Sequence, residues 1–317
     1  MSARAVTVTL NPAIDQTVRL DRLHPGHVHR ARSARDDAGG KGVNVAACLA
    51  DWGIPTAALG VLGADNDGAF RALFAQRGIA DGCLRVPGQT RTNIKLVDDA
   101  GGETTDVNLP GLVLGDGELD AVRERLDALL APGMPVVLSG SLPSGLPADA
   151  WARLQARAAQ AGARVLLDTS GDALASALDA AGGALPYAIK PNRHELETLA
   201  GTSLPDRAAW LDAARALVGR GIALVAISMG AEGALFVDRD GAAIARPPRL
   251  AAGSTVGAGD AMVAGIAAAL LEPAFDLQAC ARLATAFSMS RLESGDARRV
   301  DPAQVRAWAG EVLIEPQ

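Results

Sequence analysis

Cysteine, histidine and aromatic residues are scarce in this chain. Of its 317 residues, three are cysteine, four are histidine and 3% are Phe, Trp or Tyr. The three cysteines are odd in number and far apart, which excludes a disulfide framework and any Cys-rich zinc site. The histidines also lack metal-binding spacing, so we interpret them as polar residues of the surface or of the small projecting sheet predicted below. The sequence predicts reduced, mostly buried thiols in a cytoplasmic protein; the cysteines are Cys48, Cys83 and Cys280.

An excess of positive charge and a long hydrophobic run are also missing. The formal net charge is −6, which argues against a general nucleic-acid surface. The clearest apolar run, Ala261–Leu271, is too short to span a bilayer. The first ten residues alternate like a strand and contain no apolar core of a signal peptide. We therefore expect a globular protein without a nucleic-acid or membrane partner.

Short apolar runs alternate with Ala- and Leu-rich stretches of helical spacing, which predicts an α/β fold with a parallel sheet covered on both faces. With no interdomain linker or repeat, the chain is predicted to be one domain, 1–317. Four of the expected strands end in a polar residue: Ser139, Asp168, Lys190 and Ser228. Open α/β sheets usually bind ligands at the carboxyl ends of their strands, so these four residues lie near an expected ligand site. The expected strands are 6–10, 56–62, 136–139, 165–168, 188–190 and 224–228, and the expected helices are 43–51, 118–130, 149–161, 208–218, 277–292 and 302–313.

Two segments, at about 15–37 and 89–110, break this alternation. The first contains Thr17–Leu20 and Val28–Ser33 and has little helical character. The second has alternating apolar positions on both sides of the turn Asp98–Gly102, a pattern typical of a β-hairpin. Together the two segments predict a small sheet that projects from the main domain. Two long surface loops are the alternative.

The segment Ser254–Met262 (Ser-Thr-Val-Gly-Ala-Gly-Asp-Ala-Met) precedes an apolar run. A turn of small residues at a helix N-terminus directs backbone N–H groups and partial positive charge to one point. A carboxylate there, Asp260, makes sense if it removes a proton from an attacking hydroxyl. A simple strand-to-helix turn is the alternative. The segment lacks the third glycine of a dinucleotide fingerprint, and Gly39-Gly-Lys-Gly42 lacks the Ser or Thr of a P-loop.

Four motifs occur in a characteristic order. They are Asn11-Pro-Ala-Ile-Asp15, Gly39-Gly-Lys-Gly-Val-Asn44, Lys190-Pro-Asn-Arg-His-Glu195 and Ser254–Met262. This series resembles the PfkB branch of the ribokinase-like sugar kinases from about Val6 to the final helix. The resemblance implies a three-layer αβα sandwich with a mainly parallel sheet and a protruding β-sheet lid. It also implies ATP and Mg²⁺ as cofactors and a homodimer formed through the lid.

The sequence of the lid segment indicates which members of the family the chain resembles most. Gly88-Gln-Thr-Arg-Thr-Asn-Ile-Lys-Leu96, followed by Thr105–Gly111, is most similar to the bacterial members that phosphorylate fructose 1-phosphate. We therefore expect ATP-dependent phosphorylation of the C6 hydroxyl to give fructose 1,6-bisphosphate. The same reaction on tagatose 6-phosphate or fructose 6-phosphate is the alternative. A catalytically silent sugar-phosphate sensor is a further one.

The resemblance also assigns the catalytic and substrate-binding residues. Asp260 matches the catalytic base, and the backbone N–H groups of Gly257, Ala258 and Gly259 would stabilise charge on the transferring phosphoryl group. Without the family, Asp15 is also consistent with a turn, Lys41 and Arg91 with solvated surface cations, and Ser139 with a turn cap. The expected substrate-binding residues are Asp15, Gly39, Gly40, Lys41, Asn44, Arg91, Ser139 and Asp260.

Asn192 and Glu195 match a motif that positions Mg²⁺ and its waters near the ATP phosphates. Mg²⁺ needs few protein carboxylates because it commonly keeps several waters. On spacing alone, the same two residues predict a helix N-cap with a capping-box glutamate, and both roles are compatible. The residues expected to contact the nucleotide are Lys190, Asn192, Ser228, Gly230, Gly233, Gly257 and Gly259.

Overall fold

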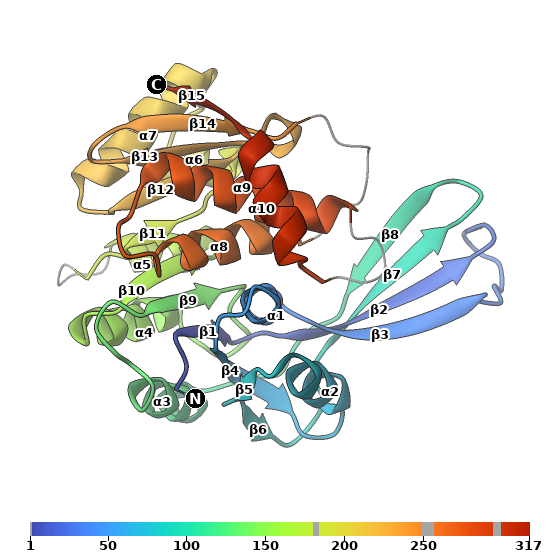
Figure 1. The fold of residues 1–317 in the computed structure, drawn as a ribbon. Coiled ribbons are helices and arrows are strands. Elements are labelled where there is room, and N and C mark those ends of the chain that lie inside the picture. The colour runs from blue at the N-terminus through green and yellow to red at the C-terminus, as the bar shows by residue number, and fades with distance from the viewer. Residues whose placement is uncertain (1, 180–183, 249–256, 294–298) are drawn as a thin grey trace.

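A central sheet of eleven strands forms the middle layer of the protein (Figure 1). The structure is a computed structural model, and it describes residues 2–179, 184–248, 257–293 and 299–317. The strand order is β15-β14-β13-β12-β11-β10-β9-β1-β4-β5, with β6 also paired to β4. In chain order the strands are β1 (Ala5–Thr9), β4 (Thr56–Gly63), β5 (Ala80–Asp81), β6 (Leu84–Val86), β9 (Pro135–Ser139), β10 (Arg164–Asp168), β11 (Ala188–Ile189), β12 (Leu224–Ser228), β13 (Ala234–Asp238), β14 (Ala242–Arg246) and β15 (Leu313–Pro316).

The strands from β12 to β5 in that order are parallel, and they are buried because helices cover both faces of the sheet. Alternate residues of β9 point to opposite faces of the sheet. Val136 and Leu138 belong to the hydrophobic core on one face, and Val137 belongs to the core on the other. The first layer of helices, on one face of the sheet, contains α1 (Lys41–Asp51), α2 (Gly68–Arg77), α8 (Ala258–Ala269), α9 (Leu277–Glu293) and α10 (Pro302–Glu311). The second contains α3 (Asp116–Asp127), α4 (Ala150–Gln160), α5 (Gly171–Asp179), α6 (Arg193–Ala200) and α7 (Arg207–Gly219), and a short 3₁₀ turn, η1 (Gly230–Glu232), follows β12.

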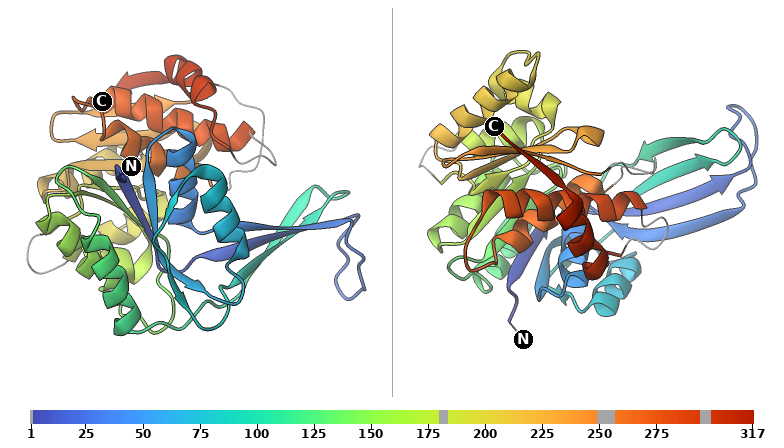
Figure 2. Two further views of the ribbon diagram at one scale, coloured as in Figure 1. Left: turned by 60° about the horizontal axis from the view of Figure 1, so that its bottom comes forward. Right: turned by 45° about the horizontal axis from the view of Figure 1, so that its top comes forward.

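A second, four-stranded sheet projects from the sandwich, as all three views show (Figures 1 and 2). Its order is β3-β2-β7-β8, formed by β2 (Ala13–Leu20), β3 (Ser33–Gly39), β7 (Thr92–Asp98) and β8 (Glu103–Asn108). β2 and β7 are parallel, whereas β2–β3 and β7–β8 are antiparallel pairs. We call this sheet the lid.

The predicted three-layer sandwich and its small projecting sheet are therefore confirmed. The bounds of the return strand in the lid were not predicted: it spans Ser33–Gly39, and Val28–Ser33 lies mostly in the loop before it. Val28 is 98% exposed, so its apolar side chain marks no buried strand. The antiparallel strands β13, β14 and β15 were also not predicted, because short apolar runs do not distinguish a strand from a helix.

Other sequence-level expectations have clear outcomes. All three cysteines are buried and unbridged. Within the described ranges, no helix has the length and apolar character needed to cross a membrane. The predicted cytoplasmic location stays a prediction.

The contact between α8 and α9 fixes the helix that carries Asp260. At Gly265 the two backbones approach so closely that a Cβ atom would lie 2.5 Å from Cα of Ala284. The neighbouring atoms are also backbone atoms, so no side-chain rotation could relieve the clash. Gly265 is therefore required for α8 to pack at this depth.

We expect Gly265→Ala to destabilise the protein by about 1–3 kcal/mol, because the added methyl group overpacks a backbone contact. Chemical denaturation measures the change. Gly310→Ala is the matched control, since no heavy atom lies within 4 Å of its added Cβ. The control should be neutral or slightly stabilising, because alanine favours a helix. Equal stability of the two variants would contradict the packing argument.

Candidate active site

The N-terminus of α8 lies beside the carboxyl ends of the central strands. Gly257 precedes the helix with φ of 83°, a left-handed conformation that favours glycine. Asp260 lies in the first turn and is only 8% exposed. Ser254, Thr255 and Val256 fall outside the described residues, so the predicted turn is described from Gly257 onward.

Asn44 of α1 holds the carboxylate of Asp260. Its Nδ2 donates a hydrogen bond of 2.8 Å to Oδ2 of Asp260. Burial raises the pKa of Asp260 to about 6, and the negative charge of Asp168 adds to the rise. The Asn44 hydrogen bond and the positive charges of Lys41 and Lys190 oppose it. The carboxylate is thus mostly ionised at pH 7 and still basic enough to accept a proton.

Asp168, at the end of β10, links two lysines below this carboxylate. Its side chain is 2% exposed and lies 3.4 Å from Nζ of both Lys41 and Lys190. Burial alone would lower the pKa of Lys41, but the charges of Asp168, Asp260 and Glu195 raise it overall. Lys41 therefore remains charged.

Lys190 lies directly at the N-terminus of α8. A Cβ atom built on Gly259 would be 3.5 Å from its Nζ. The ammonium group and the first backbone N–H groups of the helix therefore face the same space. Such a pairing is a site for an anion.

The predicted sugar-binding residues also meet, at the base of the lid. Gly39 packs against Asp15 so closely that a Cβ atom there would lie 2.4 Å from Oδ2 of Asp15. Asn93 of β7 donates a 3.2 Å hydrogen bond to Oδ1 of the same carboxylate. Gly40 is the N-cap of α1, which places Lys41 and Asn44 on the first turn of that helix.

Arg91, just before β7, is held against the Asn11-Pro12 segment. Its guanidinium donates to the carbonyl oxygens of Asn11 at 3.3 Å and Pro12 at 3.4 Å. Burial lowers the pKa of Arg91, and the charge of Asp15 opposes that change. A guanidinium has five N–H donors, so these two bonds leave donors for a substrate.

The Asn192–Glu195 segment forms the capping box that its spacing predicts. Oδ1 of Asn192 accepts from the backbone N–H of Glu195, and Oε2 of Glu195 accepts from the N–H of Asn192, both at 2.9 Å. Ser228 ends β12 and forms a bridge with Asn192. Gly230 begins the following 3₁₀ turn, and Gly233 ends it. Among the residues with described positions, no group of three or more His, Cys, Asp or Glu side chains has metal-binding geometry.

Ser139 takes a more internal position than the other predicted residues. It is fully buried, and its hydroxyl donates to the backbone oxygen of Asp168 at 3.4 Å. Its contact with a sugar stays a prediction.

Sequence reasoning assigned no role to Asn93 or Arg291, and it named Asp168 only as one of four polar strand ends near an expected ligand site. In the structure Asp168 is in register with Ser139. Asn93 lies within the lid motif and is in register with Asp15. Arg291 lies far from every motif in sequence, yet its Nε would be 3.2 Å from a Cβ on Gly257.

This arrangement is suited to phosphoryl transfer to a hydroxyl group. A buried carboxylate can accept the proton, and amide groups with an ammonium ion can stabilise negative charge beside it. The polar side chains at the base of the lid, Asp15, Asn93 and Arg91, supply acceptors and donors for a polyol.

Comparison with known proteins agrees with this chemistry. The pfkB family of carbohydrate kinases matches residues 8–304. The chain is 68% identical over 314 residues to the 1-phosphofructokinase of Xanthomonas campestris pv. campestris, covering 99% of both proteins. It is 47% identical to that of Rhodobacter capsulatus, covering 99% of this chain and 98% of the relative. A crystal structure of phosphofructokinase-2 from Escherichia coli in complex with potassium has a TM-score of 0.90 at 28% identity, covering 98% of this chain and 99% of that one.

The chain belongs to the pfkB family of carbohydrate kinases. It is an enzyme that transfers a phosphoryl group to an alcohol.

We expect kcat/KM to rise with pH through about 6 and then reach a plateau, because the Asp260 carboxylate can accept a proton only when it is ionised. In Asn44→Ala the midpoint should move to higher pH, since the lost hydrogen bond favours the charged carboxylate. The pH profile of kcat/KM measures both effects. Gln160→Ala, at an exposed position at the end of α4, should leave the midpoint unchanged. A midpoint unaffected by Asn44→Ala would show that another group titrates.

Proposed function

We propose that this protein transfers the γ-phosphoryl group of ATP to the C6 hydroxyl of fructose 1-phosphate, giving fructose 1,6-bisphosphate and ADP. The observation that carries the proposal is the buried Asp260 carboxylate at the N-terminus of α8, beside Lys190. The names of the relatives from Xanthomonas and Rhodobacter support the choice of fructose 1-phosphate. The lid motif around Arg91 supports it as well.

In this reaction Asp260 accepts the proton of the C6 hydroxyl as its oxygen attacks the γ-phosphorus. The bond to the β-phosphate oxygen breaks, and ADP leaves with the bonding electrons. Charge on the transferring group is stabilised by the backbone N–H groups of Gly257, Ala258 and Gly259 and by Lys190. The Asn44 hydrogen bond keeps the carboxylate oriented and ionised.

The substrate's own phosphate and hydroxyl groups are assigned to the base of the lid. Arg91 provides a guanidinium fork for the C1 phosphate, with Lys41 as a second cation. The carboxylate of Asp15 accepts hydrogen bonds from sugar hydroxyls. Gly39 and Gly40 let the sugar approach the backbone.

ATP is placed along the ends of β11 and β12, where Lys190, Ser228, Gly230 and Gly233 lie. Mg²⁺, when bound, supplies charge neutralisation at the nucleotide phosphates. Asn192 and Glu195 suit an ion that is bound through its waters. Glu195 accepts the capping-box hydrogen bond at Oε2, and its second carboxylate oxygen can accept a hydrogen bond from a water of the ion. Asn192 and Glu195 would hold those waters.

The chain is assigned as a single kinase domain, 1–317, with lid segments at about 15–37 and 89–110, that pairs with a second copy through the lid. One lid face carries Asp15 and Asn93, toward the sugar site. Residues paired across two strands, and residues two apart along one strand, lie on the same face of a sheet. The opposite face of the lid therefore carries four apolar residues: Val18, Ile94, Leu96 and Val107. Val107 is 43% exposed. A thin sheet with an apolar outer face needs covering, which the lid of a second copy would provide.

Comparison of kcat/KM on fructose 1-phosphate, fructose 6-phosphate and tagatose 6-phosphate tests the function. We expect fructose 1-phosphate to be preferred at least about tenfold, a difference of about 1.4 kcal/mol in transition-state binding. Asp260→Asn is the control for contaminating kinases, and its kcat should fall by a factor of about 10² or more. Preference for another sugar would overturn the substrate assignment. Binding of ATP and sugar without turnover would identify a sensor instead of a kinase.

Arg91→Ala should raise KM for fructose 1-phosphate about 10- to 100-fold, the effect of losing charged hydrogen bonds worth about 1.5–3 kcal/mol. KM for ATP should change much less, because Arg91 lies under the lid rather than beside the nucleotide site. Steady-state kinetics with each substrate varied provides the measurement. Arg19→Ala is the matched lid control, since Arg19 is half-exposed and pairs with Asp99. Equal effects of Arg91→Ala on both KM values would indicate a folding defect.

A further inference from the structure

The loop that joins β4 to α2 lies beside the segment that leads into lid strand β7. The parallel pairing of β4 with β6 ends at Gly63 and Val86. Beyond it, the backbone N–H of Ala64 donates to the carbonyl oxygen of Val86 at 2.8 Å. The N–H of Asp65 donates to the carbonyl oxygen of Gly88 at 3.1 Å. The two segments are therefore joined as far as the base of the lid.

Asn66, the next residue of this loop, binds the backbone of Thr90 at two points. Its Oδ1 accepts from the N–H of Thr90 at 2.8 Å, and its Nδ2 donates to the carbonyl oxygen of Thr90 at 2.9 Å. We call these two hydrogen bonds the Asn66 clamp. The hydroxyl oxygen of Thr90 accepts from the backbone N–H of Gly63 at 2.9 Å, and Thr90 is only 2% exposed. Every polar group of Thr90 is thus bonded to the end of β4 or to the loop after it.

The Asn66 clamp fixes the main chain of Arg91. The carbonyl group of Thr90 belongs to the planar peptide group that joins Thr90 to Arg91, so the bond from Asn66 also orients the backbone nitrogen of Arg91. On the other side, the carbonyl oxygen of Arg91 accepts from the N–H of Ile14 at 2.8 Å. With its main chain held on both sides, Arg91 extends its guanidinium to the Asn11-Pro12 segment. The fork of N–H donors is therefore oriented before a substrate arrives.

Asp67, the neighbour of Asn66, holds the same segment at its other end. Its Oδ2 accepts from Nε of Arg85 at 3.0 Å and from Nε of Arg71 at 2.7 Å. The carboxylate is only 8% exposed, and hydrogen bonds between charged groups are stronger than those between neutral ones. Two consecutive loop residues thus hold the segment 85–90 at both ends.

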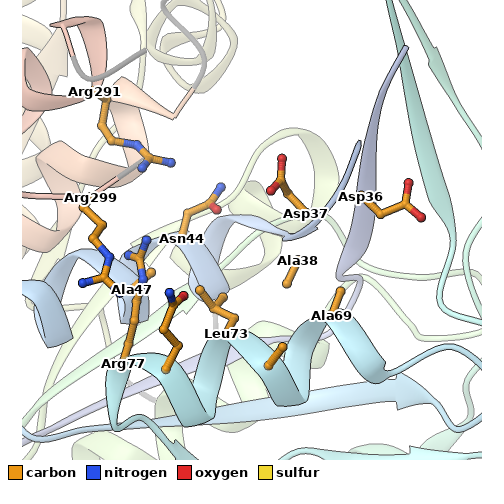
Figure 3. Close-up of a pocket in the computed structure, with 12 residues that line it drawn as sticks. Asp36, Asp37, Ala38, Asn44, Ala47, Ala69, Leu73, Arg77, Arg291 and Arg299 are labelled. Carbon is orange, nitrogen blue, oxygen red and sulfur yellow. The ribbon is translucent and has the colours of Figure 1, made fainter. Parts of the chain in front are cut away.

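α2 begins directly after this loop and supports the lid at a second place. Leu73 of α2, Ala38 of β3 and Ile14 of β2 pack in one hydrophobic cluster. Beside this contact, a polar cavity of about 290 Å³ lies between α1, α2 and the end of β3 (Figure 3). Three arginines contribute to its lining: Arg77, Arg291 and Arg299. The lid is therefore supported both at the start of β7 and at the end of β3.

We propose that Asn66 is a positioning residue for Arg91 and that it acts on the affinity for the sugar phosphate. The proposal rests on the proposed function, in which Arg91 binds the C1 phosphate. A bidentate contact between a guanidinium and a phosphate depends on the orientation of a planar fork. Without the clamp, Arg91 gains conformations that binding of the substrate must then restrain, and affinity falls by that cost.

Asn66→Ala removes both bonds of the clamp. We expect KM for fructose 1-phosphate to rise about tenfold, which corresponds to about 1.4 kcal/mol. kcat and KM for ATP should stay nearly unchanged, because Asp260 and the nucleotide site lie on other elements. Asn66→Asp has the same shape but places an oxygen against the Thr90 carbonyl oxygen, so it should raise KM for the sugar phosphate as well. Steady-state kinetics with each substrate varied provides the measurement.

Two variants serve as controls. Asp65→Ala changes the adjacent residue of the loop, whose side chain is exposed and whose backbone bond to Gly88 does not depend on the side chain. Thr90→Ser keeps the hydroxyl group that accepts from Gly63. Both should have the wild-type KM for fructose 1-phosphate.

A double-mutant cycle separates positioning of Arg91 from a general folding defect. In an Arg91→Ala background, Asn66→Ala should raise KM by less than about twofold, because the group that it positions is gone. Calorimetric titration of fructose 1-phosphate into Asp260→Asn forms of the same four proteins should give the same pattern of Kd values. This measurement needs no turnover, so its outcome is distinct from a failure of the proposed kinase activity.

Additive effects of the two substitutions would overturn the proposal, as would an unchanged KM and Kd in both Asn66 variants. If Arg91→Ala bound fructose 1-phosphate as tightly as the wild-type side chain does, the assignment of the phosphate to Arg91 would be wrong, and the role of Asn66 would be wrong with it.

Discussion

The balance of charge around the Asp260 carboxylate is the constraint on which the rest of this structure depends. A carboxylate placed where phosphates must bind would repel its own substrate and would tend to take up a proton in a buried site. The protein prevents both outcomes with the N-terminus of α8, the two lysines beside Asp168 and the hydrogen bond from Asn44. The remaining pKa of about 6 is suited to a base that works near neutral pH.

The scaffold supplies these groups from distant parts of the sequence. Lys41 and Asn44 come from α1, Asp168 from the end of β10, Lys190 from beyond β11 and Asp260 from α8. They meet because parallel strands direct their carboxyl ends to one edge of the sheet. The depth of α8 depends in turn on its backbone contact with α9 at Gly265. This packing contact thereby helps to set the position of the Asp260 carboxylate.

The lid and the arginine-lined cavity lie directly beside these groups. Strands β2 and β7 bring Asp15 and Asn93 together at the base of the lid, while β3 continues directly into α1 and also contributes Asp36 and Asp37 to the cavity behind it. Asn44 and Arg291 line that cavity, and they also lie against Asp260 and Gly257 at the start of α8.

The sequence by itself determined the layered α/β fold, the projecting sheet and most residues of the candidate site. Local patterns carry that information: apolar runs, helical spacing, the turn before Ala261 and four motifs in order. It did not determine the return strand Ser33–Gly39, the strands β13 to β15, the ion pairs of Asp168 or the position of Arg291 at Gly257. Only the tertiary structure decided these, because strand pairing and charge clusters depend on which segments become neighbours, and a short run of residues does not encode its partner.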